Sequence, residues 1–175
     1  MVIRSLYNKR GLSELITTIL MIAMVMGLAV VVWGVSRSLV NDKINQAQSC
    51  FGNFNQITIS KQYTCINSTS TEVKTSLSVG DVTIDGILVS ISGASGAKSF
   101  TINNGSSFSY VKPYGGSYGN SLTLPTKNSA LTYLINYNTI GILDADSITI
   151  APVINGKQCD VSDSLSKIDS CLLSA

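Results

Sequence analysis

The sequence predicts an α+β protein in which one long hydrophobic N-terminal helix is followed by an antiparallel β-sandwich head of Ig-like architecture. Two observations predict this division. Residues 15–36 form an uninterrupted run of 22 uncharged, mostly apolar residues. From about Ser49 the composition changes to Ser, Thr, Asn and Gly with short alternating apolar runs, which are typical of strands. We expect the helix to continue to about Gln48 and the head to occupy residues 49–175.

The apolar run is long enough to cross a membrane. At about 1.5 Å per residue it extends roughly 33 Å, and the hydrocarbon core of a bilayer is about 30 Å thick. Three basic residues precede it and two follow it: Arg4, Lys9, Arg10, Arg37 and Lys43. This distribution favours a cytoplasmic N-terminus and an extracellular head.

Small residues recur along one side of this helix. Ala23, Gly27 and Gly34 are spaced by four and seven residues, so they lie near one helix face where a neighbouring backbone can approach closely. Beyond Arg37, the helical period of apolar residues continues through Leu39, Val40, Ile44 and Ala47.

The junction before the helix reads Lys9-Arg10-Gly11-Leu12-Ser13, and the helix continues Ile16-Thr17-Thr18-Ile19-Leu20-Met21-Ile22-Ala23. A small residue therefore precedes the apolar stretch, whereas an ordinary secretory signal has its small residues after it. Over about the first forty residues, this pattern resembles the class III signal peptide of archaeal type IV pilins. The resemblance implies that residues 1–11 are a signal peptide. A prepilin peptidase would recognise Lys9, Arg10 and Gly11 and cut between Gly11 and Leu12.

The same resemblance implies what the mature protein does. Its helix, residues 12–48, would pack into the core of a homopolymeric helical filament, built by an assembly platform with an ATPase. The precursor would reside in the cell membrane and the mature protein in an extracellular filament, with adhesion as the expected role. Two alternatives stand beside it: an archaellin of a motility filament, and a monomeric membrane-anchored extracellular binding domain. A minor pilin that caps or primes a filament also fits.

Ser13 and Glu14 have two interpretations. A Ser oxygen can cap the helix, and a carboxylate suits the positive helix end. Alternatively, Glu14 neutralises the new N-terminal amine of a neighbouring Leu12. Glu14 is also a departure from the family, whose common archaeal pattern has Pro after the Ser.

Six or seven short strands are expected in the head, separated by turn signals at Asp85-Gly86, Gly93 to Gly96, Asn104-Gly105 and Asn155-Gly156. The predicted strands are Gln56–Ser60, Val73–Val79, Ile87–Ser92, Lys98–Ile102, Leu131–Tyr137 and Ser147–Val153. Strands and turns at this spacing favour a sandwich.

All four cysteines lie beyond the helix, which indicates two disulfides in an oxidising compartment. Of the three possible pairings we favour Cys50–Cys65 with Cys159–Cys171, because each closes a short local loop. A zinc site is the alternative, but the spacings contain no pair of cysteines separated by two to four residues.

Two sequons, Asn67-Ser68-Thr69 and Asn104-Gly105-Ser106, fall in predicted loops of the head and are candidate N-glycosylation sites. Tyr110, Tyr114 and Tyr118 lie in a Gly-rich segment. That segment is either an adhesive contact loop or a sandwich loop whose tyrosines cover a sheet edge.

Nothing in the sequence points to catalysis, a metal or a cofactor, and we expect no enzyme. The chain has no histidine and a net charge of +2, so neither the commonest general base nor the basic surface of a nucleic-acid-binding protein is present. The acidic pairs Asp144/Asp146 and Asp81/Asp85 lack the ligand count of a calcium loop. Ser164 and Lys167 match Ser-x-x-Lys without a companion motif, and we treat the match as chance.

Overall fold

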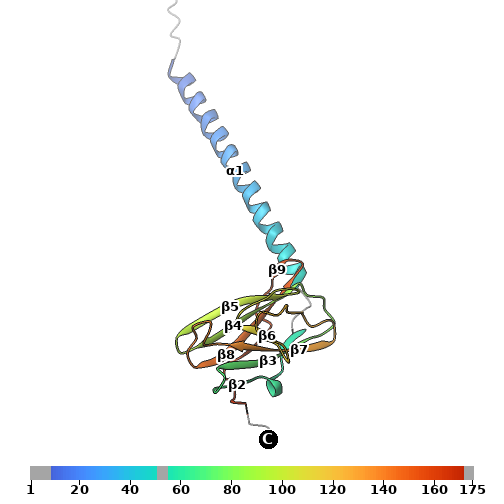
Figure 1. Ribbon diagram of the computed structural model, residues 1–175. Helices are drawn as coiled ribbons and strands as arrows, with labels where there is room; N and C mark the ends of the chain where they lie inside the picture. Colours follow the sequence, from blue (N-terminus) through green and yellow to red (C-terminus); the bar gives the residue numbers. More distant parts are fainter. Residues whose placement is uncertain (1–8, 51–54, 172–175) are drawn as a thin grey trace, which may run out of the picture. The chain divides into compact units, whose positions relative to one another are not determined.

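The structure is a computed structural model that describes residues 9–50 and 55–171 (Figure 1). It divides into two compact units, residues 1–45 and 46–175. The first part of the predicted signal peptide, residues 1–8, lies outside the described residues. Within the helix, the side chains of residues 9–14 also lie outside them.

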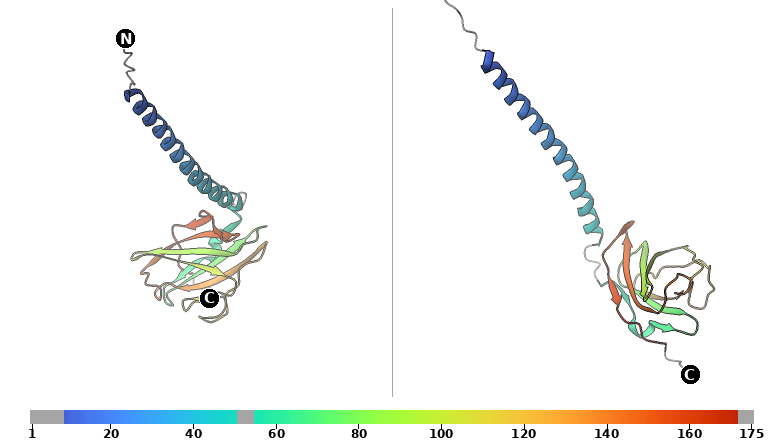
Figure 2. Two further views of the ribbon diagram at one scale, coloured as in Figure 1. Left: turned by 90° about the horizontal axis from the view of Figure 1, so that it is seen from above. Right: turned by 90° about the vertical axis from the view of Figure 1, so that its left-hand side faces the viewer.

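One α-helix, α1 (Lys9–Cys50), accounts for the described residues before the head. It is 42 residues long and contains no proline, and it is drawn as a continuous helix in both views of Figure 2. Residues Leu15–Asn41 have a mean hydropathy of 2.7 and are long and apolar enough to cross a membrane. The predicted apolar helix is therefore confirmed. It begins three residues before the predicted start and ends two residues after the predicted end.

Two antiparallel five-stranded sheets form the second unit, so the α+β prediction is confirmed at this level. The first sheet has the order β1 (Ile57–Ile59), β3 (Glu72–Val79), β7 (Ser129–Asn136), β6 (Val111–Pro113), with β2 (Cys65–Asn67) also paired to β3. The second has the order β10 (Asp163–Leu165), β8 (Ala145–Ile154), β4 (Gly86–Gly93), β5 (Gly96–Asn103), with β9 (Lys157–Gln158) also paired to β8. A 3-10 helix, η1 (Lys61–Tyr63), joins β1 to β2.

Each of the six predicted strands corresponds to an observed strand. The strands that were missed are β2, β6, β9 and β10, which contain two or three residues each. Alternation of apolar and polar residues needs at least four residues to be recognised, so these strands carry no such signal.

Turn chemistry fixes the hairpins of the second sheet. Asn155 and Gly156 connect β8 to β9 and have φ values of +52° and +69°. Two residues with positive φ give the tight turn whose twist matches antiparallel strands, and Asn-Gly is the preferred pair. The β4–β5 hairpin also has a two-residue connection, between the paired residues Gly93 and Gly96.

Side chains from both sheets meet in one hydrophobic core. Ile57 and Leu77 of the first sheet are fully buried, as are Ile87 and Ile150 of the second. Tyr133 is also buried, and its hydroxyl donates a 2.5 Å hydrogen bond to the carbonyl of Thr123. The head therefore has its own core, which contains no residue from the apolar stretch of α1.

One polar group in this core lacks a partner. Thr75 on β3 is 0% exposed, and its hydroxyl makes no hydrogen bond. A buried hydroxyl without a partner costs about 1–3 kcal/mol. We expect Thr75→Val to raise the free energy of unfolding of the head by about 1 kcal/mol, measured by denaturant titration of the full chain in detergent.

The matched control for that substitution is Thr64→Val. Thr64 is 4% exposed, and its hydroxyl accepts the backbone N–H of Ser76 at 3.3 Å. Removing that acceptor should lower the stability of the head. If both variants lose stability equally, the hydroxyl of Thr75 has a partner after all.

The disulfide pairing differs from the one favoured by sequence. Two disulfides are present, as predicted, and no cysteine of the described chain is free, so the alternative zinc site is excluded. However, Cys50 pairs with Cys159 and Cys65 pairs with Cys171, across 109 and 106 residues. The local pairing fails because the C-terminal segment returns to β2, where Ser170 forms a parallel bridge with Ile66.

Candidate functional site

The apolar surface of α1 is the largest feature of the chain that the fold leaves uncovered. Every described side chain from Leu15 to Asn41 is exposed, and the large apolar ones expose between 51% and 72% of their area. The predicted contact residues Ala23, Gly27 and Gly34 lie on this helix. A Cβ atom built at either glycine would meet nothing within 4 Å, so no contact inside the chain explains either glycine.

Exposed apolar side chains continue beyond Arg37, the first charged residue after the apolar run of α1. Beyond Arg37, Leu39 is 61% exposed, Val40 53% and Ile44 47%. At about 1.5 Å per residue the helix is roughly 63 Å long, about twice the hydrocarbon core of a bilayer. The exposed apolar side chains from Leu15 to Ile44 span roughly 45 Å, more than the hydrocarbon core of about 30 Å.

The junction that carries the family resemblance lies in the first turns of α1. Lys9, Arg10, Gly11, Leu12, Ser13 and Glu14 all have helical backbone. Their side chains lie outside the described residues, so cleavage after Gly11, recognition of Lys9 and Arg10, and both roles of Ser13 and Glu14 stay predictions.

The three tyrosines of the Gly-rich segment have different environments. Tyr110 packs against Phe100 and Phe108 with ring centroids 5.3–5.4 Å apart. The ring of Tyr118 lies over Lys112 of the edge strand β6, whose ammonium group is 4.5 Å from the ring centroid. Tyr114 is 68% exposed. The covering of a sheet edge by these tyrosines and an adhesive role for Tyr114 both stay predictions.

A cluster of charged side chains that the sequence patterns do not predict lies beneath Tyr118. The carboxylate of Glu72 on β3 forms an ion pair with Lys112 on β6 at 2.7 Å, and it accepts a short hydrogen bond from the Tyr118 hydroxyl. Ser70 also donates to this carboxylate, at 3.2 Å. Lys112 and Glu72 come from strands separated by β7, so only the sheet order brings them together.

This cluster shifts the pKa values of the Glu72 carboxyl group and the Tyr118 hydroxyl group. Burial alone would raise the pKa of Glu72, but the hydrogen bonds from Lys112 and Tyr118 and the charge of Lys112 outweigh it, so the pKa is lowered from 4.5. Burial and the bond to Glu72 raise the pKa of the Tyr118 hydroxyl far above its ordinary value.

The lowered pKa of Glu72 predicts how the head responds to acid. The carboxylate stabilises the fold fully above the ordinary value of 4.5, and this contribution is lost as pH falls through the lower pKa of the folded protein. Glu72→Gln should therefore reduce stability at neutral pH and flatten the loss of stability below pH 4.5. Tyr118→Phe should have a smaller effect of the same sign. Denaturant titrations at several pH values measure both effects. If the free energy of unfolding of Glu72→Gln depended on pH as that of the unaltered protein does, the stabilising role of the Glu72 carboxylate would be contradicted.

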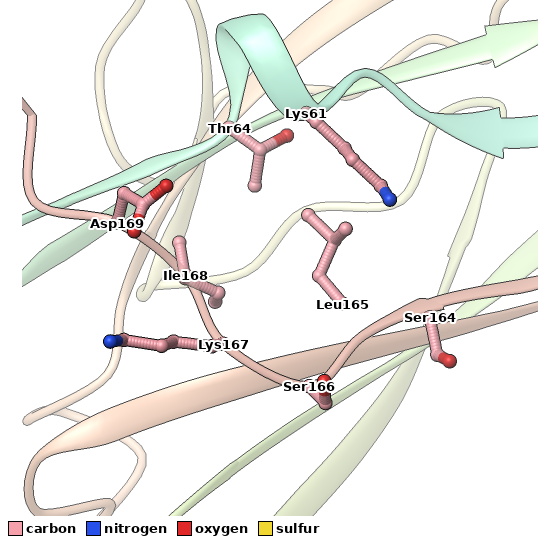
Figure 3. Close-up of a pocket in the computed structure, with 8 residues that line it drawn as sticks. All are labelled: Lys61, Thr64, Ser164, Leu165, Ser166, Lys167, Ile168 and Asp169. Atoms are coloured by element: carbon pink, nitrogen blue, oxygen red, sulfur yellow. The ribbon is translucent and has the colours of Figure 1, made fainter.

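A polar cleft of about 190 Å³ lies between η1 and the segment that follows β10 (Figure 3). Its lining consists of Lys61, Thr64 and residues 164–169. Lys61 extends toward the C-terminal segment, whereas Ser164 and Lys167 lie at opposite sides of the cleft (Figure 3). The Ser-x-x-Lys match therefore does not form a nucleophile–base pair.

Both predicted glycosylation sites are accessible. Asn67 and Asn104 are exposed. The side-chain oxygen of Asn67 accepts the N–H of Thr69 at 3.0 Å, and that of Asn104 accepts the N–H of Leu124 at 2.7 Å. A glycan on the side-chain nitrogen would leave both bonds intact. Whether either site is modified stays a prediction.

Of the two acidic pairs, Asp81 and Asp85 have partners within the fold. Asp85 accepts the N–H of Gly156 at 2.8 Å, and Asp81 pairs with Lys127 at 3.3 Å. Asp144 and Asp146 are exposed on either side of the buried Ala145. Within residues 9–50 and 55–171, no group of three or more His, Cys, Asp or Glu side chains could hold a metal ion.

No protein-family model, no curated protein and no solved structure matches this chain.

Proposed function

We propose that this protein is the structural subunit of an archaeal type IV pilus-like filament on the cell surface, with adhesion as its role. Before assembly, the apolar part of α1 holds the subunit in the cell membrane. After assembly, the helices of many copies pack against one another in the filament core. Each contact is head-to-tail and does not close, so it propagates as a helix.

The observation that carries the proposal is the length of the uncovered apolar surface on α1. A single-pass anchor needs about 20 apolar residues, whereas here Leu39, Val40 and Ile44 remain exposed beyond Arg37. In a monomeric anchored protein the membrane would cover Leu39 and Val40, which lie in the candidate span Leu15–Asn41, but Ile44 lies beyond that span. Helix packing in a filament would cover all three, and it would give Gly27 and Gly34 a close backbone neighbour that the chain itself does not supply.

The head would form the outer sheath. Two antiparallel sheets with one shared core support an Ig-like β-sandwich as its architecture. Two disulfides and two accessible sequons suit an oxidising, extracellular location.

Assembly requires proteolytic processing and an assembly machinery, and the family resemblance implies both. A membrane-embedded prepilin peptidase would recognise Lys9, Arg10 and Gly11 and release Leu12 as the new N-terminus. A platform with an ATPase would then transfer the helix from lipid to filament. The basic residues before the cut keep the precursor in the correct orientation.

The variant Leu39→Ser/Ile44→Ser tests this function. It leaves residues 15–36 unchanged, so membrane insertion and processing should be normal, but the yield of sheared filaments should fall more than about tenfold because two buried apolar contacts are lost. Leu143→Ser is the matched control, since Leu143 is an apolar head residue with 59% exposure. Normal filament yield from the helix variant would show that Leu39 and Ile44 do not pack in a filament core, and the absence of filaments from the unaltered protein would favour the monomeric anchor.

A further inference from the structure

The two disulfides and two short segments close a covalent ring in the head. Residues 50–65 form one side of the ring and residues 159–171 the other, and the Cys50–Cys159 and Cys65–Cys171 bonds join them at both ends. We call these residues and the two bonds the strap. Residues 66–158, which contain most of the core strands, lie outside it.

The strap provides two covalent routes from the end of α1 to the end of the head. One runs from Cys50 along residues 51–65 and crosses to Cys171. The other crosses from Cys50 to Cys159 and runs along residues 160–171. The routes contain 15 and 12 residues, so they are nearly equal in length. Neither passes through residues 66–158.

The two sides of the strap also bind each other directly. The N–H of Ile59 donates to the carboxylate of Asp163 at 2.8 Å, and the hydroxyl of Ser162 donates to the carbonyl of Ile57 at 2.6 Å. The cleft in Figure 3 is lined only by residues from these two sides. The described parts of the two sides, residues 55–65 and 159–171, are therefore joined to each other where β1 and β10 lie.

The C-terminal end of the strap is fastened to β2 as well. The N–H of Ile66 donates to the carbonyl of Asp169 at 2.9 Å, and the N–H of Cys171 donates to the carbonyl of Ile66 at 2.7 Å. Leu165 and Ile168 anchor the intervening segment by burying their side chains in the core.

We infer that the strap carries tension between α1 and the C-terminal end of the head, so that the core stays folded while the molecule is pulled. Without the disulfides, tension from α1 would enter through β1, a three-residue edge strand that pairs only with β3. With them, the pull is divided between two short covalent routes. This property belongs to the single chain and does not depend on polymerisation.

The non-local pairing is what gives this property. If Cys50 were bonded to Cys65 and Cys159 to Cys171, the only route between the two ends would run through residues 66–158. The whole core would then bear the load. In the observed pairing, either disulfide alone removes the core from the route, so each bond is a safeguard for the other.

Single-molecule force spectroscopy on the full chain in detergent tests the inference, with handles at both termini. Beyond the extension of α1, which all variants share, the oxidised protein should release 12 residues of the head, about 40 Å. Cys50→Ser/Cys159→Ser should release 15 residues, about 50 Å, and Cys65→Ser/Cys171→Ser again about 40 Å. Only replacement of all four cysteines should leave residues 51–171 free to extend, by about 400 Å, whether or not that variant still folds.

A step of several hundred Å in the oxidised protein, or in either two-cysteine variant, would overturn the inference. Reduction of the folded wild-type protein while it is held under tension provides a check that needs no variant to fold. The long step should appear only after the reductant is added. A long step before reduction would also overturn the inference.

Discussion

Gly11→Val is expected to leave the protein at its precursor mass and to abolish filaments completely. By the family resemblance, the peptidase cuts directly after Gly11, the small residue that precedes the apolar helix. A β-branched side chain at that position would block cleavage, and residues 1–11, with three basic side chains, would stay attached to the helix. Moving those charges into a dry filament core would be strongly unfavourable.

Gly11→Ala is the matched control, because it also adds a Cβ atom but keeps the residue small. Both variants should insert into the membrane equally, since residues 15–36 are unchanged. Immunoblots of membrane and sheared fractions measure both steps. Mature filaments from Gly11→Val would show that the junction is not the processing site.

Removal of both disulfides is expected to cost the head about 8 kcal/mol, enough to unfold a typical small domain. In the chain-entropy model, the first bond closes a loop of more than 100 residues and contributes about 5 kcal/mol. The second then closes only the 29-residue ring of the strap and contributes about 3–4 kcal/mol. Each two-cysteine variant should therefore lose only about 3–4 kcal/mol, less than half of the total.

Denaturant titrations of the full chain in detergent measure these costs, with hydrogen exchange of the core strands as the readout. The two double variants control for each other because both open the same ring. If the losses of the two double variants added up to the loss of the quadruple variant, that would contradict the interlocked arrangement, since independent local loops behave in that way.

Sequence patterns were sufficient to identify a helix or strand where the element is long and its pattern repeats. The uncharged run of α1 and the alternation along β3, β4 and β8 each extend over eight or more residues, so each identifies its element. Local turn chemistry at Asn155-Gly156 was equally readable, because only certain residues tolerate two successive positive φ values.

Sequence patterns were insufficient where distant residues meet. The disulfide pairing depends on where the C-terminal segment returns, and β2 and β10, which guide that return, are three residues each. The Glu72–Lys112–Tyr118 cluster depends on the position of β7 between β3 and β6. One signal was available in the sequence. Glu72 and Lys74 are two residues apart on a strand and so share one face, and a charged side chain on that face needs a charged partner.

The central claim is that this chain is processed after Gly11 and polymerises through α1. Mass spectrometry of filaments sheared from native cells tests both parts together. The account predicts an abundant filament protein whose mature N-terminus is Leu12. A protein found only in the membrane fraction, still beginning at Met1 or Val2, would contradict it.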